Sequence, residues 1–188
     1  MKKNLIVLLV VFFLSGCGTV AVQPNQAALA KFTGKKTFAW LVDGVPSDDV
    51  RVNNPRVQKA VLISVDKNLA GKGYVKSAVN DADLLVSWFG SVDEEVKEIH
   101  MSSFYQSYGY SALKGARPES AAGKDGKVEQ VFARGTLIID ILDPQSKTLI
   151  WRESATNTII KKMSDAELLN YVDISVKHIL EKLPDAEI

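Results

Sequence analysis

The residues that most often carry chemistry in enzymes are few in this 188-residue sequence and lie far apart. The chain has one cysteine, Cys17, and two histidines, His100 and His178. A serine, cysteine or threonine nucleophile needs a base beside it, and the sequence contains no Gly-x-Ser-x-Gly or His-Glu-x-x-His pattern. We therefore expect no catalytic residue, no metal site and no cofactor, and a protein that is not an enzyme.

Cys17 follows a segment with the features of a secretion signal. Two lysines precede ten consecutive apolar residues, Leu5–Leu14, which are too few for a transmembrane helix but suit the apolar part of a signal peptide. The end of this run, Leu14-Ser15-Gly16-Cys17, resembles the bacterial lipobox. The resemblance implies transfer of diacylglycerol to the Cys17 sulfur, cleavage between Gly16 and Cys17, and acylation of the new amino terminus. The alternative is an ordinary signal peptide with an incidental cysteine.

A lipidated Cys17 predicts where the protein is located. Two or more acyl chains hold a protein stably on a membrane without a transmembrane helix. Gly18 follows Cys17, and in the enterobacterial sorting rule an aspartate there retains a lipoprotein at the inner membrane, so we expect the outer membrane. Residues 1–16 would be the signal peptide and residues 17–34 a lipidated tether. The protein would face the periplasm, with exposure at the cell surface as an alternative.

The charge of the chain argues against nucleic acid as a partner. The sequence has 23 lysines and arginines against 22 aspartates and glutamates, and removal of the signal peptide takes two of the lysines away. A protein that binds nucleic acid needs a basic surface. The membrane, and an envelope protein or a glycan, are the partners that the sequence favours.

A long segment without an apolar period, residues 102–127, is the best candidate for an interaction surface. It is rich in serine, glycine and alanine, and it contains the aromatic residues Phe104, Tyr105, Tyr108 and Tyr110. Long loops in compact domains are usually either functional or disordered. Tyrosine gives a large contact area with a polar tip, which suits stacking on sugars or packing on a protein. An unstructured or self-packed loop is the alternative.

Apolar periodicity predicts the elements around this loop. Asn54-Pro55 begins one helix and Gly71 and Gly73 end it, while Ser164 with Glu167 forms a capping box before a second helix that Pro184 ends. Strands are expected over residues 36–42, 83–92, 96–104, 131–142 and 148–158. The order is strand, helix, strand, strand, long loop, strand, strand, helix. This order predicts a single two-layer α+β domain over residues 35–184, with a mostly antiparallel sheet and two helices on one face.

One charged pair follows from the register of the last two strands. If they pair as an antiparallel hairpin, Asp140 lies near Arg152 on the face opposite to Leu137, Ile139 and Ile141. A cross-strand ion pair is the simplest interpretation, and an exposed pair contributes well under ~1 kcal/mol. We therefore expect a structural ion pair rather than a binding site.

Several short segments in a fixed order resemble the bacterial lipoprotein family catalogued as domain of unknown function 4136. They are Lys36–Trp40, Gly73-Tyr74, Ala82–Ser87, Gly135–Asp140 and Leu149–Arg152. The resemblance covers about residues 32–184. The family typically carries glycine after the Trp-Arg pair, where this chain has Glu153, and its middle loop is often rich in glycine and tyrosine. The family has no established activity, so the resemblance implies a fold and a location and transfers no catalytic residues.

These observations favour an outer-membrane lipoprotein that acts as a non-enzymatic binding or envelope-assembly accessory module. A peptidoglycan- or glycan-binding module is the alternative, and an envelope hydrolase with an unfamiliar site is less favoured. The ligand, the partner and the oligomeric state do not follow from the sequence.

Overall fold

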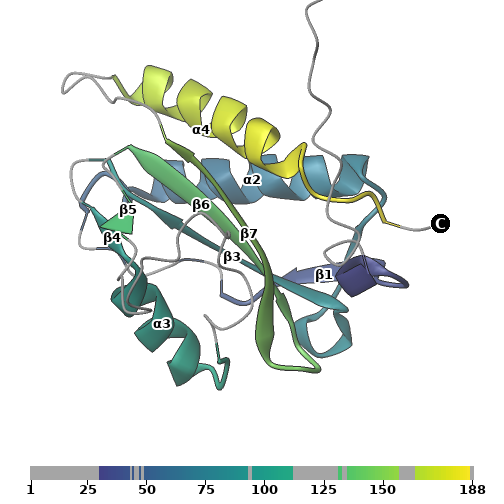
Figure 1. The fold of residues 1–188 in the computed structure, drawn as a ribbon. Coiled ribbons are helices and arrows are strands. Elements are labelled where there is room, and N and C mark those ends of the chain that lie inside the picture. The colour runs from purple at the N-terminus through teal and green to yellow at the C-terminus, as the bar shows by residue number, and fades with distance from the viewer. Residues whose placement is uncertain are drawn as a thin grey trace, which may run out of the picture.

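The computed structural model describes residues 30–42, 44, 47, 49–92, 95–111, 131–132, 135–156 and 164–186 (Figure 1). Gly16, Cys17, the signal peptide and residues 112–127 lie outside the described residues. The helices are the 3₁₀ turns η1 (Ala30–Phe32) and η2 (Val79–Asp81) and the α-helices α2 (Pro55–Gly71), α3 (Glu98–Ser107) and α4 (Asp165–Leu180). The strands are β1 (Thr37–Trp40), β2 (Val75–Lys76), β3 (Leu84–Gly90), β4 (Val96–Lys97), β5 (Val131–Phe132), β6 (Thr136–Asp143) and β7 (Thr148–Thr156).

The main sheet has five strands in the order β2-β1-β3-β6-β7. The short strand β1 pairs in parallel with β2 and β3, whereas the long strands β3, β6 and β7 pair antiparallel. Every residue of β3 from Leu84 to Phe89 is buried, as expected for a central strand that is covered on both faces. The prediction of an α+β fold with a mostly antiparallel sheet is confirmed.

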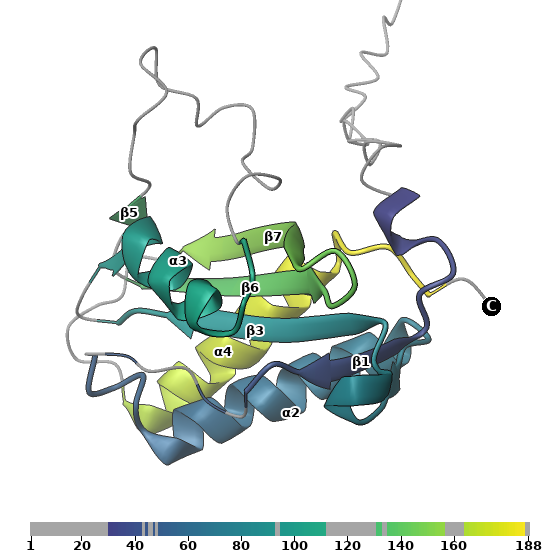
Figure 2. The same ribbon diagram turned by 90° about the horizontal axis from the view of Figure 1, so that it is seen from below.

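Helices α2 and α4 lie side by side on one face of this sheet (Figure 2). A hydrogen bond of 2.7 Å from the Ser64 hydroxyl to the Asp173 carboxylate joins the two helices, and the apolar stripe of each is buried. The expected caps are present, because the Asn54 side chain accepts from the backbone N–H of Arg56 and Ser164 and Glu167 form a capping box. Gly73, with φ of 88°, turns the chain after α2.

The third helix corrects one prediction. Residues 96–104 were expected to form a strand, but only Val96 and Lys97 do so, and α3 follows at once. This helix lies on the sheet face opposite to α2 and α4 (Figure 2). The segment expected to begin a loop at residue 102 is therefore helical as far as Ser107, and the sheet is covered by helices on both faces.

The folded domain is longer than residues 35–184. Phe32, which was expected to belong to the tether, is 3% exposed. At the other end, the backbone N–H of Ala186 donates to the carbonyl of Lys72 over 2.8 Å. Both ends of the expected domain are thus extended by residues that pack onto it.

Asp83 fixes the start of β1. Its Oδ2 accepts from the backbone N–H groups of Lys36 and Thr37, both at 2.9 Å, and from the Thr37 hydroxyl at 2.8 Å. The bond from the Lys36 N–H is the main cause that holds the pKa of Asp83 below its usual value. This carboxylate therefore stabilises the fold when it is ionised.

We predict that Asp83→Asn lowers the free energy of unfolding by about 1–2 kcal/mol at neutral pH. A pKa that is lower in the folded state contributes stability above the unfolded pKa of about 4, and this contribution is lost as the pH falls through the folded pKa. The difference in free energy of unfolding between the variant and the wild type should therefore become smaller at acid pH. Urea unfolding at several pH values measures it, with Asp81→Asn, an exposed neighbour, as the control. A gap that stays constant with pH would contradict the assignment.

Candidate functional site

A buried cluster of polar side chains joins α3 to the sheet. The register pairs Asp140 with Arg152, as predicted. The Arg152 guanidinium donates two hydrogen bonds to the Asp140 carboxylate, from Nε to Oδ1 at 2.7 Å and from Nη2 to Oδ2 at 2.6 Å. The Tyr105 hydroxyl donates to the same carboxylate at 2.5 Å. Side-chain exposure is 0% for Asp140 and 7% for Arg152. The predicted ion pair is therefore present, and both of its side chains are buried.

Tyr105 titrates far from its usual range. Burial, and then the negative charge of Asp140, raise the pKa of Tyr105 well above the ordinary value. The phenol therefore stays protonated and acts as a hydrogen-bond donor to a buried carboxylate. This arrangement makes Tyr105 a fixed point of α3 and not a group that exchanges protons near neutral pH.

The four aromatic residues expected to form a contact surface lie mainly inside the domain. Tyr105 and Tyr110 are buried, Phe104 is half-buried and Tyr108 is 45% exposed. The Phe104 ring packs edge-on against Phe89, with ring centres 5.4 Å apart. The interpretation of these residues as one exposed surface is therefore wrong, since Tyr105 and Tyr110 cannot offer a ring to a partner. Phe104 and Tyr108 remain in reach of the surface.

The packing of α3 leaves a cleft of about 810 Å³ at one end of the sheet. It opens where β1 stops and β3 continues, because β1 pairs with β3 only as far as Val86. Its apolar lining comes from both sides of the sheet end, and its rim is polar. The apolar residues are Val52, Trp88, Phe89, Val96, Met101 and Phe104, and the polar ones are Ser47, Asp49, Asn53, Ser91, Glu95, Lys97 and His100.

Asp49 holds one wall of this cleft in place. Its Oδ1 accepts from the backbone N–H groups of Arg51 and Val52, and its Oδ2 accepts from that of Val92 at 2.6 Å. The carboxylate is 4% exposed and its lone pairs are used by the backbone. Asp49 thus ties the segment before α2 to the end of β3, and sequence reasoning did not single it out.

Two charged or ionisable side chains of the cleft lining, those of His100 and Glu95, are exposed. His178 is also exposed, and it lies on α4 away from the cleft lining. Within the described residues, no group of three or more histidines, cysteines, aspartates and glutamates is placed to hold a metal ion. The cleft has the size of a small-ligand site, with an apolar floor and a charged rim.

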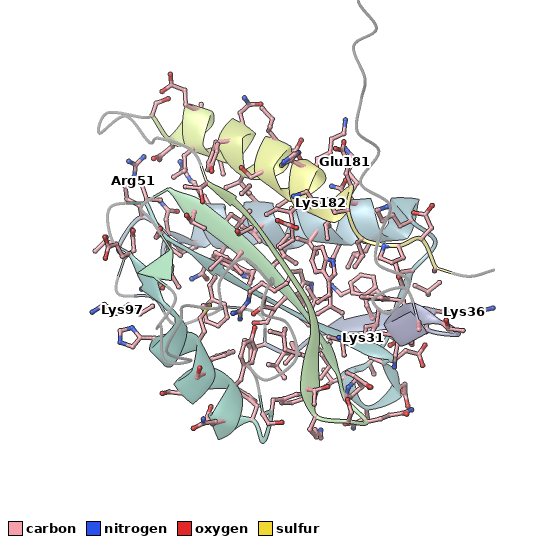
Figure 3. All side chains as sticks on the ribbon, in the orientation of Figure 1. Lys31, Lys36, Arg51, Lys97, Glu181 and Lys182 are labelled. Carbon is pink, nitrogen blue, oxygen red and sulfur yellow. The ribbon has the colours of Figure 1, made fainter. Side chains whose placement is uncertain are left out.

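A charged side chain from each of two elements marks the cleft end of the molecule. Figure 3 shows Arg51 and Lys97 at this end, and Lys31 and Lys36 at the other end of the sheet. No helix in the part of the chain that the structure describes is both long and apolar enough to cross a bilayer.

Comparison with known proteins gives one family and distant structural neighbours. The model of the family described as "Domain of unknown function (DUF4136)" matches residues 20–185. Among curated proteins, no sequence matches the chain.

Three solved structures are similar to this chain, each with a TM-score of 0.43 and each matching 82% of it. One is a PelC dodecamer from Paraburkholderia phytofirmans, at 15% identity over 89% of that chain. Another is a PDZ domain protein from Parabacteroides distasonis, at 14% identity over 33% of that chain. A third is a DUF4136 family protein from Bacteroides thetaiotaomicron, at 13% identity over 92% of that chain.

Proposed function

The chain belongs to the DUF4136 family, and we propose that it is an outer-membrane lipoprotein whose domain is a non-enzymatic binding or envelope-assembly accessory module. The observation that carries the anchor is the position of the one cysteine, which stands directly after Leu14-Ser15-Gly16. The observation that carries the binding role is the cleft between α3 and the end of β3. We therefore propose this cleft as the contact surface, in place of the tyrosines of residues 102–127.

The chemistry of the cleft supports binding over catalysis. The buried carboxylate in it, Asp49, accepts three backbone hydrogen bonds, which leaves it poorly suited to act as a base. His100 lies at the exposed rim. A half-buried aromatic ring, Phe104, beside Asn53 and Glu95 also suits a sugar, which stacks on rings and hydrogen-bonds to amides and carboxylates. A glycan is therefore the second candidate ligand.

We predict that a double substitution at the rim, Asn53→Ala with His100→Ala, reduces capture of the partner in crosslinked envelopes. Both side chains are exposed, so the fold should be retained. Tyr108→Ala, directly after α3 and outside the cleft lining, is the control. Quantitative mass spectrometry of the captured proteins measures the effect.

Co-sedimentation with purified sacculi separates the two ligands. A glycan-binding module pellets with sacculi and is released by the rim substitutions, whereas a protein-binding module stays in solution. The cleft has no role in the proposed function if two results occur together. In the first, the rim variant captures the same proteins as the wild type, and in the second the wild type does not pellet with sacculi.

A further inference from the structure

The described chain starts with η1 at one end of the sheet. Ala30 begins η1, and Phe32 in the same turn is buried in the core. Thirteen residue steps separate Cys17 from Ala30, and a fully extended chain of this length spans no more than about 45 Å. A lipid on Cys17 would therefore keep Ala30 within about 45 Å of the bilayer, and this end of the domain is the one joined to the lipidated segment.

Two cations at this end have no anionic partner among the described residues. Lys31 and Lys36 are exposed and form no ion pair there (Figure 3). The neighbouring lysines are neutralised in three ion pairs, which are Lys35–Asp143 at 3.4 Å, Lys72–Asp185 at 2.9 Å and Lys76–Asp66 at 2.8 Å. Asp81 is also exposed nearby, so the positive excess is small and charge is a secondary argument.

Two exposed aliphatic side chains lie beside these lysines. Val75 is 62% exposed and Val79 is 49% exposed. The backbone N–H of Val75 donates to the carbonyl of Lys36 over 2.9 Å, and the Thr37 hydroxyl donates to the carbonyl of Asp81 in η2 over 3.3 Å. The valines and lysines therefore share one end of the sheet.

Composition alone does not select this end. Val50, which is 84% exposed, stands next to Arg51 at the opposite end (Figure 3). The attachment of the chain at Ala30 favours the end with Lys31 and Lys36, because that end is joined directly to the segment that would carry the lipid. Val50 therefore serves as a matched control for any membrane contact.

We infer that Lys31, Lys36, Val75 and Val79, the tether-side patch, rest on an anionic phospholipid surface, with the valines among the headgroups and the lysines beside phosphates. This inference rests on the proposed anchor at Cys17. The cleft then lies at the far end of the domain, near Arg51 and Lys97 (Figure 3).

A single introduced thiol tests this orientation. Cys17 is the one cysteine in the chain, so a lipidated Val79→Cys protein has one free thiol, which takes a polarity-sensitive dye. The full lipidated protein is placed in vesicles of phosphatidylethanolamine and phosphatidylglycerol that contain spin-labelled lipid. We expect a blue shift and quenching for dye at position 79, and neither for dye on Val50→Cys. Equal quenching at both positions, or quenching at position 50 alone, would overturn the inference.

The lysines are tested in the same assay. Lys31→Glu with Lys36→Glu should lose quenching at position 79 in these vesicles, whereas Lys97→Glu should retain it. A protein that floats with the vesicles but shows no quenching at position 79 disproves the tether-side patch and leaves the anchor intact. A protein that does not float disproves the anchor, and the inference with it.

Discussion

Replacing Arg152 with alanine should lower the free energy of unfolding by about 3–5 kcal/mol, because the substitution leaves the Asp140 carboxylate buried without its counter-charge. The Asp140 side chain is 0% exposed, and two of its three described contacts come from the guanidinium of Arg152. For a domain of this size the change corresponds to a fall in Tm of roughly 6–20 °C. Thermal unfolding followed by circular dichroism measures it.

An exposed ion pair is the control for this prediction. Arg56 lies 3.9 Å from Asp165, and their side chains are 77% and 66% exposed. Exposed pairs contribute about 0–1 kcal/mol, so Arg56→Ala should leave Tm nearly unchanged. Similar shifts for the two arginine variants would contradict the burial of the Asp140 cluster.

Most of the stability lost in Arg152→Ala should come from leaving the Asp140 carboxylate buried and unpaired, and less from losing its attraction to Arg152. Apolar side chains of similar volume often replace a buried ion pair with little loss of stability. The double variant Asp140→Leu with Arg152→Met should thus unfold closer to the wild type than Arg152→Ala does. Tyr105→Phe should improve it further by removing a buried hydroxyl that has lost its Asp140 acceptor. A double variant less stable than Arg152→Ala would show that the ion pair itself holds the fold.

The proposed lipid anchor predicts that Cys17→Ser abolishes fatty-acid labelling of the protein and leaves residues 1–16 attached. A serine hydroxyl has no thiolate form and does not accept the diacylglyceryl group that the lipobox implies. Without acyl chains the stable membrane hold is lost, and only the apolar run before residue 17 remains to retain the precursor. Labelling with a palmitate analogue, intact mass and flotation of membranes measure the three effects.

Gly18→Asp is the matched control for the anchor. It should keep the acyl label and the cleavage but move the protein from the outer to the inner membrane, as the enterobacterial sorting rule implies. Acyl label that persists in Cys17→Ser would show that the lipobox interpretation is wrong. Label that is present in neither variant nor wild type would point to an ordinary signal peptide.

Most of the sheet and both flanking helices could be predicted because their signals are local. Asn54 and the Ser164–Glu167 pair mark the two helix starts, and the alternation of residues 136–143 gives the register that pairs Asp140 with Arg152. Two-residue strands such as β2 give no periodic signal, and the shift of register between Ile141 and Leu142 is likewise invisible in the sequence.

Helix α3 could not be recognised while residues 96–104 were interpreted as a strand and the aromatic residues after Ser103 as polar contact residues. Met101, Phe104, Tyr105 and Tyr108 follow a spacing of three, four and seven residues, which is the stripe of an amphipathic helix when tyrosine is treated as apolar. The same omission explains why the burial of Asp140 could not be predicted. Asp140 lies on the predicted face of the sheet, and α3 covers that face (Figure 2).

The central place of β3 also determines when the domain can fold during synthesis. Phe38, the partner of Leu84, is synthesised before β3. Asp140, the partner of Ser87, is synthesised 53 positions after it. A chain that emerges amino terminus first therefore holds an apolar strand with one open edge until residues 136–143 arrive, and such edges associate readily with other chains. The second edge of β3 can thus be paired only after residues 136–143 of the 188-residue chain have emerged, and a chaperone that shields β3 would be most useful in that interval.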